Sequence, residues 1–546
     1  MRRFLFFCLT PAVFFSPCNL FSQNSANLKL VAHLNPLPPA SNWQFSEVAG
    51  AGDLAVIGGF QSGNSNVWIY DLADRANPRL LSAIPINTRS WDVQVHGRYL
   101  FIGLSGRMEW HDILNPAQPK LVKRFTPDPP INPHTFFVAG NTLYIADYAA
   151  FPYGIRIFDI TDKKNPQELA EISDPNWSIH DMTVIHKRLY GAWISGLGGL
   201  LVADVSNPGQ PVELTRLNYP NAATHNAWPT EDEQFILTTD EVSFTRNNLK
   251  IWDARTPGQL SQTDEYEVRN ASSPIHNVYV RGRYAYMSYY CEGLRIVDIA
   301  DPFNHQEVAF YDFNDSVSCE GFNSNWGVYP FSKLIYASDM QNGLYVLEFA
   351  DHPAANLSGE VVDALTNAPV AGAMVYFRDE YPTSRTNVSG SFEIPWFKKD
   401  KVTLVAEAAG YFADTTTATT NPAQATFVSI RLKPLTTGIE SSNDETVREF
   451  TLLPTYPNPL APAAAISRTA TQITFRLPHA ENVQIDVYNL FGQRVRELLK
   501  ASRPAGEHRV LWNGRDNADQ QVAAGIYLLQ MRAGEFAATR KITLIQ

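Results

Sequence analysis

The segment IRIFDITDKKNP, residues 155–166, decides the fold of this chain. Its first residues alternate as in a β-strand, and Asp159 closes that strand ahead of a turn that ends in Pro166. An aspartate in this place accepts a hydrogen bond from the backbone N–H two residues on, and the proline fixes φ so that the chain reverses. The segment therefore predicts a strand followed by a tight turn.

The same unit recurs seven times, and a repeat of this kind sets the architecture of the whole chain. The acid that closes each strand is, in order, Asp71, Asp112, Asp159, Asp204, Asp253, Asp298 and Glu348. Successive acids are 41 to 50 residues apart, which is the length of a four-stranded propeller blade. The sequence thus predicts an all-β protein with a seven-bladed β-propeller over residues 28–350.

One strand is out of phase with this repeat. LKLVAHL, residues 28–34, resembles an outer strand but precedes the first complete unit. A propeller has to close its ring, so we expect this strand to pair with residues 344–349 of the last blade. The span from Leu28 to Phe349 is 322 residues, or 46 for each of seven blades. The alternative is an open stack or two adjacent β-domains.

The repeat also resembles a known family. IRIFDITDKKNP and LRIVDIADP, which begins at Leu294, are similar to the LVIVD-repeat propellers of bacterial secreted proteins. The resemblance covers about residues 28–350 and implies the fold. It implies no activity, because the family has no generally assigned one.

Two further β-sandwich domains are expected downstream. Residues 356–434 resemble the carboxypeptidase regulatory-like domain, which is not catalytic, so we expect a spacer or adhesive module. The residues that carry this resemblance are Gly359, Asp363, Gly390, Phe392, Gly410 and Tyr411. Residues 435–449 are polar and acidic, as in a linker.

Residues 450–546 resemble the C-terminal sorting domain of type IX secretion substrates. Its ordered motifs include VQIDVYNLFGQRVREL from Val483 and VAAGIYLLQMRAG from Val522. The resemblance implies export across a Bacteroidetes-type outer membrane, followed by removal of the domain. The alternative is a permanent Ig-like domain.

The N-terminus predicts a secretory signal peptide over residues 1–22. Arg2 and Arg3 precede an apolar stretch too short to span a bilayer in the mature protein. Lipidation at Cys18 is the alternative, although Pro17 stands where a small residue is wanted. We expect no membrane span downstream, because no later segment has the roughly 18 uninterrupted apolar residues that one needs.

The charge balance bears on the partners. The formal net charge is −11 and no long basic run occurs, so nucleic acid is not an expected partner. We expect a monomer that binds an extracellular protein or glycan and is handled by the type IX secretion machinery.

Two cysteines, Cys291 and Cys319, remain once the signal peptide is removed. In an oxidising compartment such a pair predicts a disulfide, and two buried free thiols are the alternative.

A polar pair stands at the expected start of the innermost strand in several blades. The pairs are Trp91-Asp92, His134-Thr135, His180-Asp181, His225-Asn226, His276-Asn277 and Cys319-Glu320. Equivalent positions meet in a ring at one mouth of the central channel, which indicates a ligand or cation site. Carboxylates and amides suit Ca²⁺, whereas imidazole suits transition metals. The alternative is that these side chains bind neighbouring blades together. The candidate binding residues are Asp92, His134, His180, Asp181, His225, Asn226, His276, Asn277 and Glu320.

No motif of a known catalytic site stands out. HExxH, GxSxG and CxxC are all missing from the sequence. We therefore predict a secreted or surface non-enzymatic binding or adhesion protein with no organic cofactor. The alternative is a hydrolase or lyase acting at the channel mouth, with His180 and Asp181 as its acid/base pair.

Overall fold

The computed structural model describes residues 25–544 except for several short stretches. Those stretches are 39–41, 62, 64, 149–153, 197, 243–247, 257, 270, 314–318, 354–356, 380–382, 395–400, 422–423, 436–448, 454, 456–470 and 519. The predicted signal peptide and most of the predicted linker lie outside the described residues. Within the described part of the chain, no helix has the length and hydropathy needed to cross a membrane.

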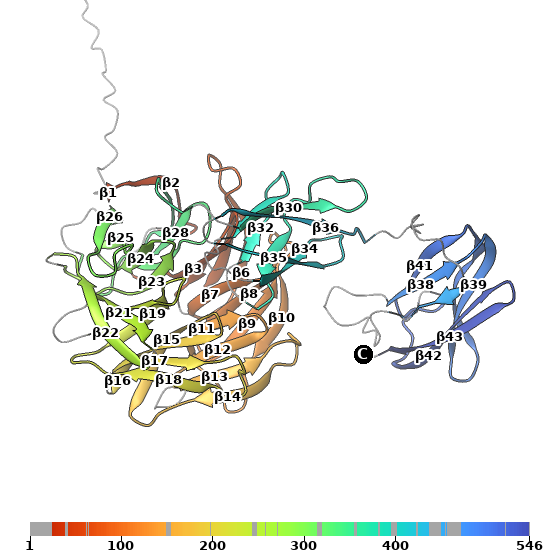
Figure 1. Cartoon of the computed structure of the whole chain (residues 1–546), viewed down its shortest axis with the longest axis horizontal. Coiled ribbons are helices and arrows are strands. Elements are labelled where there is room, and N and C mark those ends of the chain that lie inside the picture. The colour runs from red at the N-terminus through yellow and green to blue at the C-terminus, as the bar shows by residue number, and fades with distance from the viewer. Residues whose placement is uncertain are drawn as a thin grey trace, which may run out of the picture. The chain divides into compact units, whose positions relative to one another are not determined.

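Seven sheets follow one another along the first two thirds of the chain (Figure 1). The first consists of β3 (Phe45–Ala51), β4 (Leu54–Gly59), β5 (Asn66–Asp71) and β6 (Arg79–Pro85). The second consists of β7 (Ser90–His96), β8 (Tyr99–Leu104), β9 (Arg107–Asp112) and β10 (Lys120–Phe125). The third consists of β11 (Pro133–Ala139), β12 (Thr142–Asp147), β13 (Gly154–Asp159) and β14 (Gln167–Ile172). The fourth consists of β15 (Trp177–Ile185), β16 (Arg188–Gly196), β17 (Gly199–Asp204) and β18 (Val212–Leu217).

The remaining three sheets complete the propeller. The fifth consists of β19 (Thr224–Pro229), β20 (Phe235–Asp240), β21 (Leu249–Thr256) and β22 (Gln259–Tyr266). The sixth consists of β23 (Val278–Arg281), β24 (Tyr284–Tyr289), β25 (Gly293–Asp298), β26 (Gln306–Tyr311) and β1 (Ser25–Ala26). The seventh consists of β27 (Asn325–Tyr329), β28 (Ile335–Asp339), β29 (Gly343–Phe349) and β2 (Leu28–Leu34). The predicted all-β fold with a seven-bladed propeller is confirmed.

The turn after the third strand of each blade forms as the repeat predicts. In six blades the Asp side chain that closes this strand accepts a hydrogen bond from the backbone N–H two residues on, at 2.7–3.0 Å. Asp159, for example, accepts from the N–H of Thr161 at 2.7 Å. The repeated aspartate therefore supplies the acceptor that each chain reversal needs.

The ring closes through the N-terminal strand. β2 pairs antiparallel with β29, in a register that joins Leu28 to Phe349 and Leu34 to Leu344. β27 in turn lies beside β3, so the last blade meets the first. This confirms the predicted closure. The short strand β1, which pairs with the outer strand of the sixth blade, was not predicted.

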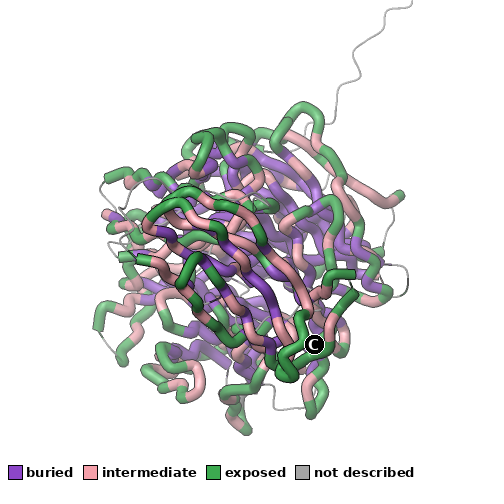
Figure 2. Tube along the Cα trace, turned by 90° about the vertical axis from the view of Figure 1, so that its right-hand side faces the viewer, coloured by how far each residue is buried: buried purple, intermediate pink, exposed green. Residues whose placement is uncertain are grey.

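The core of the propeller lies between neighbouring blades. Side chains from alternate strand positions meet there, and Trp110, Trp193 and Tyr286 are among the largest that are fully buried. The inner strands of the blades are mostly buried, while the outer strands and the turns are more exposed (Figure 2). Packed blades of this kind hold the inner strands at fixed positions around the channel.

A small sandwich follows the propeller within the same compact unit, residues 1–434. One of its sheets holds β33 (Ser391–Ile394), β30 (Leu357–Asp363) and β36 (Thr426–Leu432). The other holds β32 (Thr383–Arg385), β31 (Met374–Phe377), β34 (Lys401–Glu407) and β35 (Asp414–Thr419). The sandwich contacts the second blade, where the N–H of Gly97 donates to Thr383 Oγ1 at 2.9 Å.

Residues 435–546 form a second unit. It is another β-sandwich, with one sheet of β37 (Thr451–Leu452), β38 (Thr471–Leu477) and β41 (Gly506–Trp512). The other sheet holds β40 (Arg494–Arg503), β39 (Glu481–Asn489), β42 (Gly525–Ala533) and β43 (Phe536–Leu544). Its core gathers around Trp512, Ile485 and Met531.

Candidate functional site

In six blades, the innermost strand has a β-bulge near its start, at the mouth of the channel. In the second blade, for example, the register of β7 against β8 shifts between Ser90 and Asp92, so Trp91 is left unpaired. Equivalent shifts occur in the first, third, fourth, fifth and seventh blades. A bulge re-aims side chains, and both members of most predicted polar pairs line the channel cavity.

In five of the six predicted pairs, the first residue contributes to a closed ring of seven aromatic side chains. Neighbouring ring centroids are 4.0–5.4 Å apart. In order around the channel the members are Phe60, Trp91, His134, His180, His225, His276 and Trp326. Phe60 follows β4 and completes the ring in the first blade, where the inner strand carries Ser46.

The second residue of each of these five pairs belongs to a polar layer that joins neighbouring blades. Asn226 Nδ2 donates to Asp181 Oδ2 at 2.7 Å, and Asn277 Nδ2 donates to Glu47 Oε2 at 3.1 Å. The backbone N–H of Phe136 donates to Asp92 Oδ2 at 3.0 Å. The alternative considered for these residues, hydrogen bonding between blades, therefore holds for much of the layer.

Glu47 belongs to this layer and was missed from the sequence. Its counterpart in the seventh blade is Gly327, where an added Cβ would lie 1.8 Å from Glu47 Oε1. Only glycine leaves room for the Glu47 carboxylate there. In both strands a valine follows the residue that belongs to the polar layer, as in Glu47-Val48 and Gly327-Val328. An alignment of the blades on this valine would have placed Glu47 and Gly327 in the layer.

The assignment of Glu320 to the ring is wrong. Its side chain is exposed and lies outside the channel cavity, in the segment that precedes β27. β27 begins only at Asn325, so the aromatic ring takes Trp326 from this blade instead. The extra segment before the strand displaces Cys319-Glu320 from the equivalent position.

The channel holds a small cavity of about 70 Å³ that is lined by members of the aromatic ring and of the polar layer. Since one water needs about 10–15 Å³ by this measure, there is room for roughly five waters. The space suits an ion or small ligand better than a sugar ring.

Burial controls the charge of the channel groups. Desolvation raises the pKa of Asp92 to about 7 and that of Asp181 to about 6. Desolvation, together with repulsion from Asp92 and Asp181, also raises the pKa of Glu47 well above its ordinary value. Asp92 and Asp181 thus titrate near neutral pH.

The four imidazoles respond in the opposite sense, because burial disfavours their charged form. Burial lowers the pKa of His134 to about 4 and that of His276 to about 3. The pKa values of His180 and His225 lie well below the ordinary value, through burial and the neighbouring imidazoles. All four rings are therefore neutral at pH 7 and keep a nitrogen lone pair.

The predicted acid/base pair has no direct hydrogen bond among the described residues. Asp181 Oδ1 accepts from the N–H of Met182 at 2.6 Å, and Asp181 Oδ2 accepts from Asn226. His180 belongs to the aromatic ring, next to His134 and His225. The two side chains thus lie in different layers of the channel.

Three family models match parts of the chain. The LVIVD repeat matches residues 88–126, 192–218 and 275–312. The CarboxypepD_reg-like domain matches residues 357–442, and the FlgD Ig-like domain matches residues 463–535. The chain therefore contains LVIVD repeats and a carboxypeptidase regulatory-like domain, as their resemblance predicts. No curated protein matches the chain at a significant level.

Solved structures resemble the chain only distantly. One is PorZ, a bacterial surface component of the type IX secretion system of Porphyromonas gingivalis, at 12% identity and a TM-score of 0.42. The match covers 94% of this chain and 61% of that one. Another is hydrazine synthase of Kuenenia stuttgartiensis, at 13% identity and a TM-score of 0.43, covering 58% of this chain and 99% of that one. Similarities at this level say nothing about function.

Proposed function

We propose that this chain is a secreted or surface binding protein that recognises an extracellular protein or glycan at the channel mouth of its propeller. Two aromatic side chains exposed at this mouth support the proposal. Trp43 is 36% exposed and Phe322 is 40% exposed. Exposed aromatic residues are frequent anchors of binding interfaces, since they bury a large area on contact.

Both residues continue the aromatic ring outward. Trp43 lies 5.5 Å from Phe60 and 6.4 Å from Trp326, measured between ring centroids. Phe322 lies 5.3 Å from Tyr290, which is 4.9 Å from His276. A partner that stacks on Trp43 and Phe322 would therefore cover the mouth without entering the small cavity.

The test is a binding screen of the full chain against immobilised glycans and extracellular matrix proteins. We expect saturable binding that Trp43→Ala weakens at least tenfold. Phe303→Ala is the matched control, because Phe303 is an exposed aromatic (54%) in the turn between β25 and β26. Equal loss in both variants, or no saturable ligand, would contradict the proposal.

The alternative, a hydrolase or lyase, is tested on the same preparation. The full chain is incubated with glycosides, lactones and esters, beside the variant His180→Ala. Turnover that His180→Ala abolishes would replace the binding proposal.

We further propose export by type IX secretion, with residues 1–22 as signal peptide and residues 450–546 as sorting domain. The sequence motifs support this, and so does the folding of residues 471–544 as part of a separate small sandwich unit. In a host with this pathway, deletion of residues 450–546 should leave the protein in the periplasm. The full chain in a host that lacks the pathway is the control. An exported protein whose intact mass still includes residue 546 would contradict the processing.

A further inference from the structure

Three side chains at the channel mouth lie close enough together to bind one metal ion. His180 comes from β15, His225 from β19, and Glu241 directly follows β20. One ligand atom from each lies within 4.8 Å of the other two. His225 Nε2 is 3.6 Å from Glu241 Oε2, and the two imidazole centroids are 4.0 Å apart.

All three residues are buried, with exposed fractions of 7% for His180, 2% for His225 and 7% for Glu241. Within the part of the chain that the structure describes, His180 Nδ1 and His225 Nδ1 have no hydrogen-bond partner. A buried polar atom without a partner is uncommon in folded proteins. The nitrogen of His225 that faces Glu241 is Nε2, and at 3.6 Å from Oε2 it is too far for a hydrogen bond, which leaves a place for an ion between the two groups.

A hydrogen bond orients the carboxylate. Tyr290 Oη donates to Glu241 Oε1 at 2.7 Å, which leaves Oε2 on the side of His225. Groups that hold a ligand in this way are a regular part of metal sites. Tyr290 is itself buried and packs against His276.

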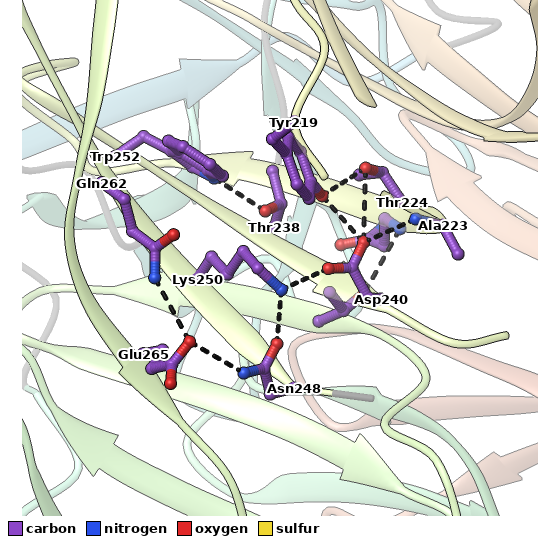
Figure 3. A network of polar contacts seen from close by, with 12 residues as sticks. Tyr219, Ala223, Thr224, Thr238, Asp240, Asn248, Lys250, Trp252, Gln262 and Glu265 are labelled. Carbon is purple, nitrogen blue, oxygen red and sulfur yellow. Dashed lines mark hydrogen bonds and ion pairs between the residues drawn. The ribbon is translucent and has the colours of Figure 1, made fainter. Parts of the chain in front are cut away.

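A buried polar network around Asp240 lies next to two of the ligands in the sequence (Figure 3). Asp240 Oδ1 accepts from Tyr219 Oη at 2.7 Å and from the N–H of Ala223 at 3.0 Å, while Lys250 pairs with Oδ2. The N–H of Glu241 donates to the carbonyl of Ala223 at 3.1 Å. The network thus ties the end of β20, where Glu241 follows, to the start of β19, which carries His225.

Two imidazoles and one carboxylate form a donor set that suits a borderline transition metal. Zn²⁺ is commonly held by such ligands, and three protein ligands leave one tetrahedral position open. Ca²⁺ is a poor fit, because it takes six to eight oxygen ligands. We propose that His180, His225 and Glu241 bind a divalent transition-metal ion of the Zn²⁺ class at the channel mouth.

This inference is independent of the proposed partner. The ligands lie in and beside the aromatic ring, whereas Trp43 and Phe322 are exposed outside it. His180 and His225 line the channel cavity, so the open coordination position has room for water or a small anion.

The test is a Zn²⁺ titration of the untagged full chain, stripped of metal and measured against a chromogenic chelator. We expect one tight equivalent. His180→Ala, His225→Ala and Glu241→Gln should each weaken binding roughly a hundredfold, and Tyr290→Phe roughly tenfold. His134→Ala is the matched control, since His134 is in the same ring, 4.5 Å from His180, but outside the ligand set.

A second readout keeps the inference testable if a variant misfolds. Co²⁺ added to the wild-type chain should give the visible absorption of a low-coordinate nitrogen and oxygen site, and Zn²⁺ should displace it. Zn²⁺ should also raise the unfolding temperature of the wild type, because it binds only the folded state. No bound equivalent in the wild type, or equal loss in His134→Ala, would overturn the proposal. So would a preference for Ca²⁺.

Discussion

At the scale of single residues, the channel is built from titratable groups whose charged forms are disfavoured by burial. The four imidazoles are neutral, and the pKa values of Asp92, Asp181 and Glu47 are all raised. Neutral imidazoles can stack against one another without repulsion. The protein thereby packs polar side chains into a buried channel, where the same groups fully charged would be costly.

We predict that Asp92→Asn changes how stability depends on pH. The folded-state pKa of Asp92, about 7, lies above its ordinary value of 3.8, so the folded chain binds the proton more tightly than the unfolded chain. The stability that this adds is full below pH 3.8 and is lost as pH rises through 7. Between pH 4 and 8, the wild type should lose about 4 kcal/mol relative to the variant.

Urea unfolding at several pH values, with a chelator present, measures this difference. Asn keeps an oxygen that accepts from the N–H of Phe136, so the hydrogen bond between blades is preserved in the comparison. Two stability curves that run parallel over this range would contradict the prediction.

At the scale of elements, every outer strand of the propeller carries a register shift. These shifts occur in β6, β10, β14, β18, β22, β26 and β2. All of these strands except β26, which pairs with β1, leave unpaired backbone groups at the rim, and a bulge twists such an edge away from pairing with another chain.

Ring closure by β2 gives the first prediction at this scale. A chain that begins at Asn35 lacks β2, so β29 loses its neighbour and the seventh blade has only three strands. We expect its unfolding transition to shift to lower urea and to broaden. A chain that begins at Asn27 is the control, because it loses only the two-residue strand β1 at the edge of the sixth blade. Equal transitions in the two chains would contradict the role of β2.

The disulfide between Cys291 and Cys319 leads to a second prediction for the structural elements. The structure joins Cys291, just after β24, to Cys319, ahead of β27, with a Cα–Cα distance of 5.6 Å and a separation of 28 residues. It links the sixth and seventh blades. Replacing both cysteines with serine should lower the free energy of unfolding by about 3 kcal/mol. Alkylation of denatured, unreduced protein checks the bond itself, and labelling of both thiols would show that it is not formed.

At the scale of the whole molecule, the regulatory-like sandwich is part of the propeller's packing. Met374 of β31 is fully buried and belongs to a core cluster with residues of the first two blades, including Val56 and Val95. Lys333 in the seventh blade also pairs with Glu393 of the sandwich at 3.3 Å. The two domains therefore share a hydrophobic core.

We predict that Met374→Ala weakens the packing between the propeller and the regulatory-like sandwich. Removing a buried Met side chain costs about 2–5 kcal/mol. Calorimetry of residues 1–434 should show a single transition in the wild type, which the variant splits or lowers. Phe427→Ala, at a position 67% exposed on the same sandwich, should change little. A wild type that already unfolds in two steps would contradict the shared core.

The sequence by itself determined the architecture, because the propeller consists of blades with a repeated sequence motif. Each turn aspartate accepts the hydrogen bond that the chain reversal of its blade needs, so the aspartates recur with the period of the blades. That period predicted seven blades and the displaced N-terminal strand that closes the ring. The same equivalence located five polar pairs of the channel. The carboxypeptidase regulatory-like domain was predicted in the same way, from its own local motifs.

Only the tertiary structure decided what those positions do together. Glu47 fits because Gly327 leaves space across the junction of the first and last blades, which are far apart in the chain. Glu241 joins His180 and His225 from a strand end outside the repeated pairs, and Glu320 is displaced by an extra segment. These are contacts between positions that are not equivalent, and periodicity predicts only what equivalent positions share.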